Sequence, residues 1–155
     1  MKHMILISLS VAALFASGCS TPSESNSAAV ASESPTPPKT NLTVLEGSWK
    51  GRDVTPGQEG PASLTVSGQT LEFHGADAND WMKGTFTLRE DANPKQFVGI
   101  VTECAAPEKV GQKAYAIYKI EDGTLTISGN QLGDPNFPLA FDVPGCRQLV
   151  FKHDQ

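Results

Sequence analysis

The side chains best suited to chemistry are few and lie far apart in this chain of 155 residues. His74 and His153 are candidate bases or metal ligands, but His74 has the outward-facing phase of an alternating segment and His153 lies near the chain end. We therefore expect both imidazoles to be solvated. The carboxylates of residues 77–80 occupy a turn-like segment that lacks the spacing of a calcium-binding EF-hand loop and its bidentate glutamate.

No combination of these groups predicts a catalytic arrangement. The chain has no Ser-His-Asp or Cys-His pair at a suggestive spacing, no nucleophile elbow, no phosphate-binding loop and no zinc-protease signature. The sequence therefore predicts a protein that is not an enzyme and that uses no metal and no cofactor. Acid–base chemistry by carboxylates on different strands stays open.

The segments that would position these side chains alternate between apolar and polar residues, as strands do. The first strand is expected around 45–49, and a short extended piece at 139–141. The other expected strands are 63–67, 70–74, 81–90, 96–104, 114–121, 124–128 and 148–152. Gly-Gln at 68–69 and Asp-Gly at 122–123 predict tight hairpins. Short strands at this spacing predict one all-β domain over residues 42–155, and sequential hairpins favour an antiparallel up-and-down barrel of about eight strands.

Several aromatic side chains are expected to point into this barrel. They could line a cavity for a ligand, or they could simply fill the interior, because a small barrel needs large side chains to exclude water. The residues concerned are Phe73, Phe86, Phe97, Tyr118 and Phe141.

The charge balance argues against nucleic acid as a partner. Lys and Arg together number 12 and Asp and Glu 17, which gives a formal net charge of −5. A nucleic-acid-binding domain is expected to carry a basic stripe or patch, and this sequence has none.

The N-terminus has the pattern of a secretory signal. A positive start precedes an apolar run at 4–15, which is shorter than the 20 or so residues of a membrane span. Small residues then precede Cys19, and this ending resembles the bacterial lipobox. The resemblance implies that residues 1–18 are a lipoprotein signal peptide and that Cys19 carries diacylglycerol and an acyl chain such as palmitate. The alternative is an ordinary cleaved signal with a chance cysteine.

Residues 19–41 are rich in Ser, Pro, Ala and Thr and are predicted to form a disordered tether. Ser20 follows Cys19, and the lack of Asp at this place is typical of lipoproteins sent to the outer membrane. We therefore expect a protein of the cell envelope, lipid-anchored to the outer membrane and facing the periplasm.

Cys104 and Cys146 remain once Cys19 is acylated, and an even number of cysteines in an oxidising compartment predicts a disulfide between them. On the chain-entropy argument, such a bond would stabilise the fold by about 3–4 kcal/mol. The alternative, a metal or redox pair, finds no support, because the chain has no CxxC and no histidine at ligand-like spacing.

Trp49 is expected to anchor the core, since a tryptophan buries a large area. Gly47 and Trp49 form a Gly-x-Trp that resembles the opening of lipocalin-like (calycin-type) barrels, in which an arginine of the last strand lies across the indole. The resemblance implies that Arg147 covers Trp49 and closes the barrel through a cation–π contact of about 0.5–2 kcal/mol. The alternative is a core tryptophan beside a bend.

The order of motifs is similar to that of a family of small bacterial lipocalin-like domains, abundant in planctomycetes and of unknown function. The resemblance brings no catalytic residues. The matching segments are LEGSW (45–49), GTFTL (84–88), NPK (93–95), AIYKIEDGTLTI (116–127) and PLAF (138–141).

These features lead to two expectations for function. The first is a non-enzymatic binding module whose barrel takes a small apolar or amphipathic molecule. The second is a protein-interaction or inhibitor module that acts on an envelope partner, such as a hydrolase, through the barrel-end loops 51–61, 104–111 and 129–138. The third expectation for function, after these two, is an enzyme.

Overall fold

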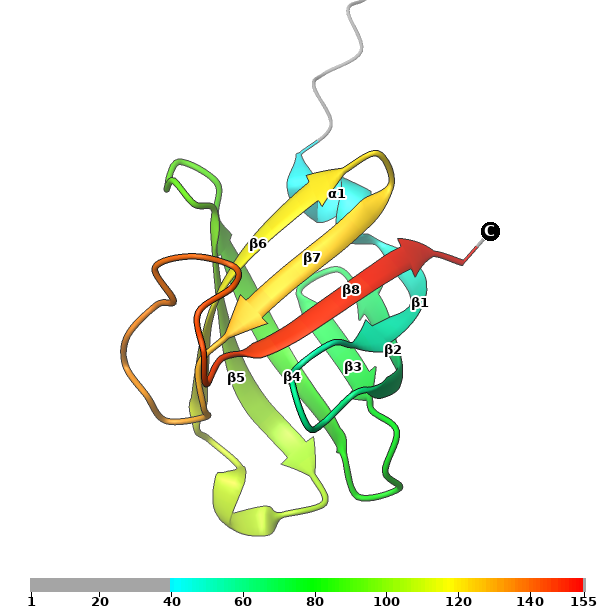
Figure 1. Cartoon of the computed structure of the whole chain (residues 1–155), viewed down its shortest axis with the longest axis vertical. Coiled ribbons are helices and arrows are strands. Elements are labelled where there is room, and N and C mark those ends of the chain that lie inside the picture. Colours follow the sequence, from blue (N-terminus) through cyan, green and yellow to red (C-terminus); the bar gives the residue numbers. More distant parts are fainter. Residues whose placement is uncertain (1–39, 155) are drawn as a thin grey trace, which may run out of the picture. The chain divides into compact units, whose positions relative to one another are not determined.

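The computed structural model describes residues 40–154, and strands dominate this part of the chain (Figure 1). Each strand pairs antiparallel with the next, and the last pairs with the first, so the sheet closes into a barrel. The predicted all-β, eight-stranded up-and-down barrel is therefore confirmed. The strands are β1 (Gly47–Asp53), β2 (Gly60–Ser67), β3 (Thr70–His74), β4 (Trp81–Arg89), β5 (Gln96–Cys104), β6 (Lys113–Glu121), β7 (Thr124–Gly129) and β8 (Arg147–His153).

The predictions for the N-terminus concern residues outside the described range. The predicted signal peptide, Cys19 and nearly all of the predicted tether lie outside residues 40–154. Within the described range, no helix has both the length and the apolar character that crossing a membrane would require.

The alternation expected of half-buried strands is clearest in β2. Ala62, Leu64 and Val66 are buried, whereas the residues between them are exposed or half-buried. Successive side chains of a strand point to opposite faces of the sheet, so every second residue of β2 enters the core. Side chains alternate between the two faces in the other strands too, and this places one apolar face of the sheet inside the barrel. In β6, however, residues 116–118 are buried in succession.

The contact that closes the barrel is the β1–β8 pair, and it depends on Gly51. Trp49 pairs with His153, Gly51 with Phe151 and Asp53 with Leu149. A Cβ atom at Gly51 would overlap the carbonyl oxygen of Val150. Glycine at this position therefore allows the backbone of β8 to approach β1 closely.

The entry to the barrel differs from the prediction. Residues Asn41–Leu45 form a short helix, α1, so Leu45 lies in a helix and not in the first strand. The side chain of Thr40 caps this helix by accepting a hydrogen bond from the backbone N–H of Thr43. Leu42 and Leu45 are three positions apart and share one face. Both pack against the core, and this contact favours a helical turn over an extended chain.

The two ends of the barrel have different connections. Because the strands alternate in direction, α1, the tight turns at 68–69 and 122–123 and the connection at 90–95 share one end, which we call the helix end (Figure 1). The opposite end, the loop end, carries the other four connections. They run over residues 54–59, 75–80, 105–112 and 130–146, and the third contains a 3₁₀ turn at Pro107–Lys109.

Candidate functional site

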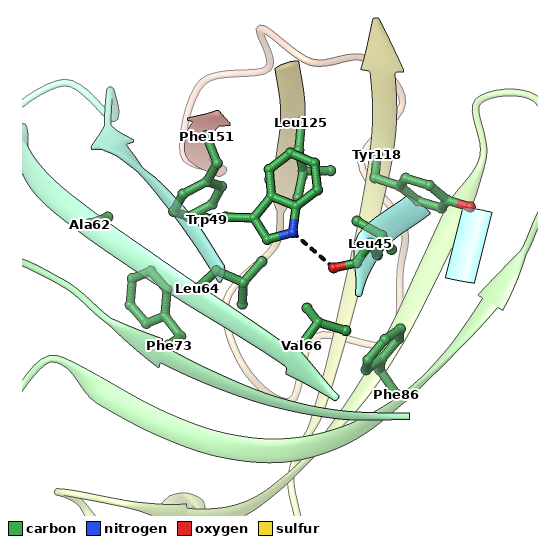
Figure 2. Close-up of a cluster of buried hydrophobic side chains, with 10 residues drawn as sticks. All are labelled: Leu45, Trp49, Ala62, Leu64, Val66, Phe73, Phe86, Tyr118, Leu125 and Phe151. Carbon is green, nitrogen blue, oxygen red and sulfur yellow. Dashed lines mark hydrogen bonds between the residues drawn. The ribbon is translucent and has the colours of Figure 1, made fainter. Parts of the chain in front are cut away.

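The interior of the barrel is filled by side chains. Figure 2 shows the ten buried residues of the core around Trp49, with the indole N–H donating to the carbonyl oxygen of Leu45 at 2.8 Å. The cavity left among the apolar side chains beneath α1 has a volume of about 30 Å³. That is the space of a single water molecule. Sites for small organic ligands are roughly tenfold larger or more. The interior therefore has the geometry of a packed core.

Four of the five aromatic residues predicted to face the interior do so. Phe73, Phe86 and Tyr118 are buried in the core, and Phe97 packs against it with its ring 5.0 Å from that of Phe86. Phe141 is the exception. It lies in the β7–β8 connection, where the expected extended piece at 139–141 does not form, and its ring faces the ammonium of Lys119 at 5.4 Å.

The predicted contact between Arg147 and Trp49 is wrong. The ring that meets Trp49 is that of His153, edge-on at a centroid distance of 4.9 Å. The register of β1 with β8 explains the difference, since Trp49 pairs with His153 at the helix end while Arg147 begins β8 at the loop end. Trp49 and β8 do take part in closing the barrel, as the resemblance implied, but through a different residue.

Arg147 is instead the centre of an ionic cluster at the loop end. Its Nε donates to Oδ2 of Asp53 at 2.7 Å, its Nη1 donates to Oδ1 of Asp80 at 2.9 Å, and its Nη2 pairs with the second oxygen of Asp80. Its guanidinium lies 4.7 Å above the ring of Phe73. Burial opposes the charge of Arg147, but the hydrogen bonds and charges of the two aspartates outweigh it and raise the pKa of this side chain.

This cluster joins three parts of the chain at one end of the barrel. Asp53 ends β1, Asp80 closes the 75–80 connection and Arg147 begins β8. Asp53 is only 2% exposed and also accepts a hydrogen bond from the backbone of Thr55. The carboxylates are thus occupied by fixed donors, and the cluster functions as a structural clasp rather than as an acid–base pair.

The predicted disulfide is not formed, since Cys104 and Cys146 are both free thiols. Cys104 ends β5, Cys146 precedes β8, and β6 and β7 lie between them in the barrel. Three strand spacings amount to about 14 Å along the sheet, whereas the Cα atoms of a disulfide lie within about 7 Å. Each thiol donates to a local oxygen instead, at 3.0 Å in both cases: Cys104 to Ala106 O, and Cys146 to Asn130 Oδ1.

The remaining polar candidates do not come together. His74 is exposed, as predicted, and its Nε2 lies 2.8 Å from Glu72 Oε1. This hydrogen bond lowers the pKa of Glu72. His153 is exposed too, although its ring also contacts Trp49. Over residues 40–154, no three His, Cys, Asp or Glu side chains are grouped so that they could hold a metal ion.

The feature that the sequence reasoning missed lies on the outside of the barrel. Ile117 and Ser128 face outward by strand alternation, yet both are fully buried. The 130–146 connection covers this wall, with the ring of Phe137 edge-on to that of Tyr115 at 5.1 Å. The same connection displays Leu139, which is 89% exposed. A signal for the covered wall was present in β6, whose middle residues are apolar on both faces.

The fold and its sites thus define a closed and filled up-and-down barrel, whose distinctive surfaces are its loop end and its covered outer wall. No protein-family model, curated protein or solved structure matches this chain.

Proposed function

We propose that this protein is a lipid-anchored lipoprotein of the cell envelope that binds a partner protein through the connections of its loop end. The observation that carries the proposal is Leu139, which is 89% exposed between a buried Pro138 and a half-buried Ala140. Contact with a partner would remove the apolar surface of this side chain from water. Such a residue is suited to fill an apolar pocket on another protein.

Two further exposed apolar residues lie in other connections of the loop end. Val54, in the β1–β2 connection, is 40% exposed, and Val110, in the β5–β6 connection, is 47% exposed. Thr40, where the described chain begins, lies beside α1 at the opposite end of the barrel. In a protein anchored through Cys19, the chain from the anchor therefore enters the barrel at the end that does not carry these connections.

A small apolar or amphipathic ligand inside the barrel stays a prediction, as does the resemblance to lipocalin-like domains. The packed interior gives the interaction proposal more support, because a cavity of about 30 Å³ has no room for such a ligand. Ligand entry would require side chains such as Leu45 and Phe86 to leave the core.

Replacing Cys19 with serine tests the anchor. The thioether cannot form on serine, so the variant is expected to appear in the soluble envelope fraction, whereas the wild-type chain, acylated at Cys19, should stay with membranes. Fractionation of cells followed by mass spectrometry of the N-terminal peptide measures both the location and the acyl chains. A variant that still fractionates with membranes contradicts the anchor.

Replacing Leu139 with aspartate tests the interaction. We expect recovery of the partner by cross-linking in native membranes to fall at least tenfold, which corresponds to about 1.4 kcal/mol. Ile100 is a matched control, because it is an apolar residue that is 41% exposed within strand β5 itself and not in a connection. Its replacement with aspartate should leave recovery unchanged. Equal losses in the two variants would count against the proposal, as would a reproducible small-molecule adduct on the protein, without a partner protein, in native mass spectrometry.

A further inference from the structure

Two buried oxygen atoms on the outer wall of the barrel have no hydrogen-bond partner: Oε1 of Gln96 and Oγ of Ser128. Gln96 in β5 pairs with Ile117 in β6, which pairs with Ser128 in β7, so the three form one row across the wall. The residues next to them in each strand pack into the core, so this row faces outward. Ile117 and Ser128 are nevertheless 0% exposed.

The cover over this row is a segment that we call the strap, residues 135–144 of the β7–β8 connection. Its ends are pinned, because Gly133 N–H donates to Lys113 O at 2.9 Å and the thiol of Cys146 donates to Asn130 Oδ1. Between these points, no hydrogen bond in the described chain joins the strap to a strand; only Asn130 Nδ2, just past β7, donates to Asn136 O. Gly133 and Gly145, which flank the strap, both have a φ of +87°.

Side-chain contacts therefore hold the strap against the wall. Phe137 packs on Tyr115, and the guanidinium of Arg89 lies 6.0 Å from the Phe137 ring. Arg89 is the cross-strand neighbour of Gln96, which places Phe137 beside the buried row. Phe141 adds its contact with Lys119. Contacts of this kind can be exchanged for those of another apolar segment without breaking a β-ladder.

The strap is also a poor chemical match for the wall that it covers. Both unpaired atoms are free to accept a hydrogen bond, and buried acceptors without donors destabilise the arrangement that buries them. Pro138 is the buried residue at the middle of the strap, and proline has no N–H to donate. The strap thus supplies apolar cover but leaves Gln96 Oε1 and Ser128 Oγ unpaired.

We propose that the strap is a displaceable cover and that the wall beneath it binds an extended apolar peptide segment of a partner protein. The segment packs on Ile117 and donates N–H groups to Gln96 Oε1 and Ser128 Oγ. The strap occupies this site in the unbound protein and competes with the partner. The site itself does not depend on the loop-end contact of Leu139; only the assignment of the peptide to a partner protein rests on the proposed function.

The first test measures binding of a fluorescent peptide to the full chain. The peptide is Asn-Phe-Ala-Leu-Ala-Phe, the strap's own sequence over 136–141 with alanine in place of Pro138. Saturable binding is expected by fluorescence anisotropy. Replacing both Phe137 and Phe141 with serine should tighten binding at least tenfold, because a loosened strap competes less well. Leu139→Ser is the matched control and should change nothing, since Leu139 points away from the wall. Absence of binding, or no gain on loosening the strap, overturns the proposal.

The second test separates an unpaired hydroxyl from one bonded to a buried water. Ser128→Ala is expected to raise Tm, because it removes a buried group without a partner, and to weaken peptide binding about two- to tenfold, because it removes an acceptor. Thr126→Val, on the same face of β7, should leave both quantities nearly unchanged. A lower Tm for Ser128→Ala would show that its hydroxyl is already satisfied and would overturn the proposal. Leu139→Asp should retain peptide binding. This variant therefore distinguishes a failure of the loop-end interaction from a failure of the peptide site.

Discussion

Replacing Arg147 with methionine is expected to lower the free energy of unfolding by about 3–5 kcal/mol. The reason is Asp53, whose carboxylate is 2% exposed and would remain buried without its counter-charge. The substitution would also release Asp80, so the 75–80 connection would lose its link to β8. Methionine keeps much of the apolar stem, so the loss reports on the charge and its hydrogen bonds rather than on volume.

Urea denaturation of the purified domain measures this difference. The free energy of unfolding of Arg147→Lys should lie between those of the wild type and Arg147→Met, because an ammonium keeps the charge but cannot reproduce the forked hydrogen bonds to both carboxylates. Arg52, exposed in β1, is the control, and its replacement with methionine should change stability by no more than about 0.5 kcal/mol. If the variants at 147 and 52 have the same stability, the ionic cluster does not clasp the barrel.

Replacing Trp49 with alanine is expected to destabilise the protein by about 3–5 kcal/mol, the range for deleting a large aromatic side chain from a core. The indole is 2% exposed and stands at the centre of the buried cluster (Figure 2). Its loss would leave a void between β1 and β8 and would remove the donor to Leu45 O. The helix α1 should therefore loosen as the core weakens.

Trp81 provides the comparison, because it is the second tryptophan and lies half-buried on the outside of β4, stacked near His74. Trp81→Ala should cost less than half as much as Trp49→Ala by the same denaturation measurement. Trp49→Phe should fall between wild type and Trp49→Ala, since it restores most of the volume but not the indole N–H. Losses of similar size at 49 and 81 would refute the central role of Trp49.

The strands and their order could be read from the chain before any coordinates. Alternation in 63–67 and 124–128 places the apolar residues of β2 and β7 on one face because the side-chain period of a strand is two. The Asp-Gly at 122–123 marks the β6–β7 hairpin because its backbone angles suit a tight turn, and Asp122 and Gly123 both have positive φ. These are local properties, and an unbroken series of neighbouring pairs leads to a closed sheet.

The polar contacts at the barrel ends and on its wall could not be predicted from the sequence in the same way. Arg147 meets Asp53 and Asp80 rather than Trp49, and Cys104 does not meet Cys146, because the register between β1 and β8 and the strand order decide which distant residues are neighbours. Alternation along a strand predicts which face of the sheet a side chain is on. It does not predict which residues of other segments lie next to that side chain.

The outer wall shows the same division. Ile117 and Ser128 have the outward phase of their strands, and the pattern correctly assigns them to that face. Their burial follows from residues 135–144 folding back over β6, held by Phe137 and Phe141. Local sequence therefore set the strands, the turns and the apolar face, since these depend on backbone preferences and spacing. The clasp, the free thiols and the covered wall arose from contacts between segments far apart in the chain, which no local preference encodes.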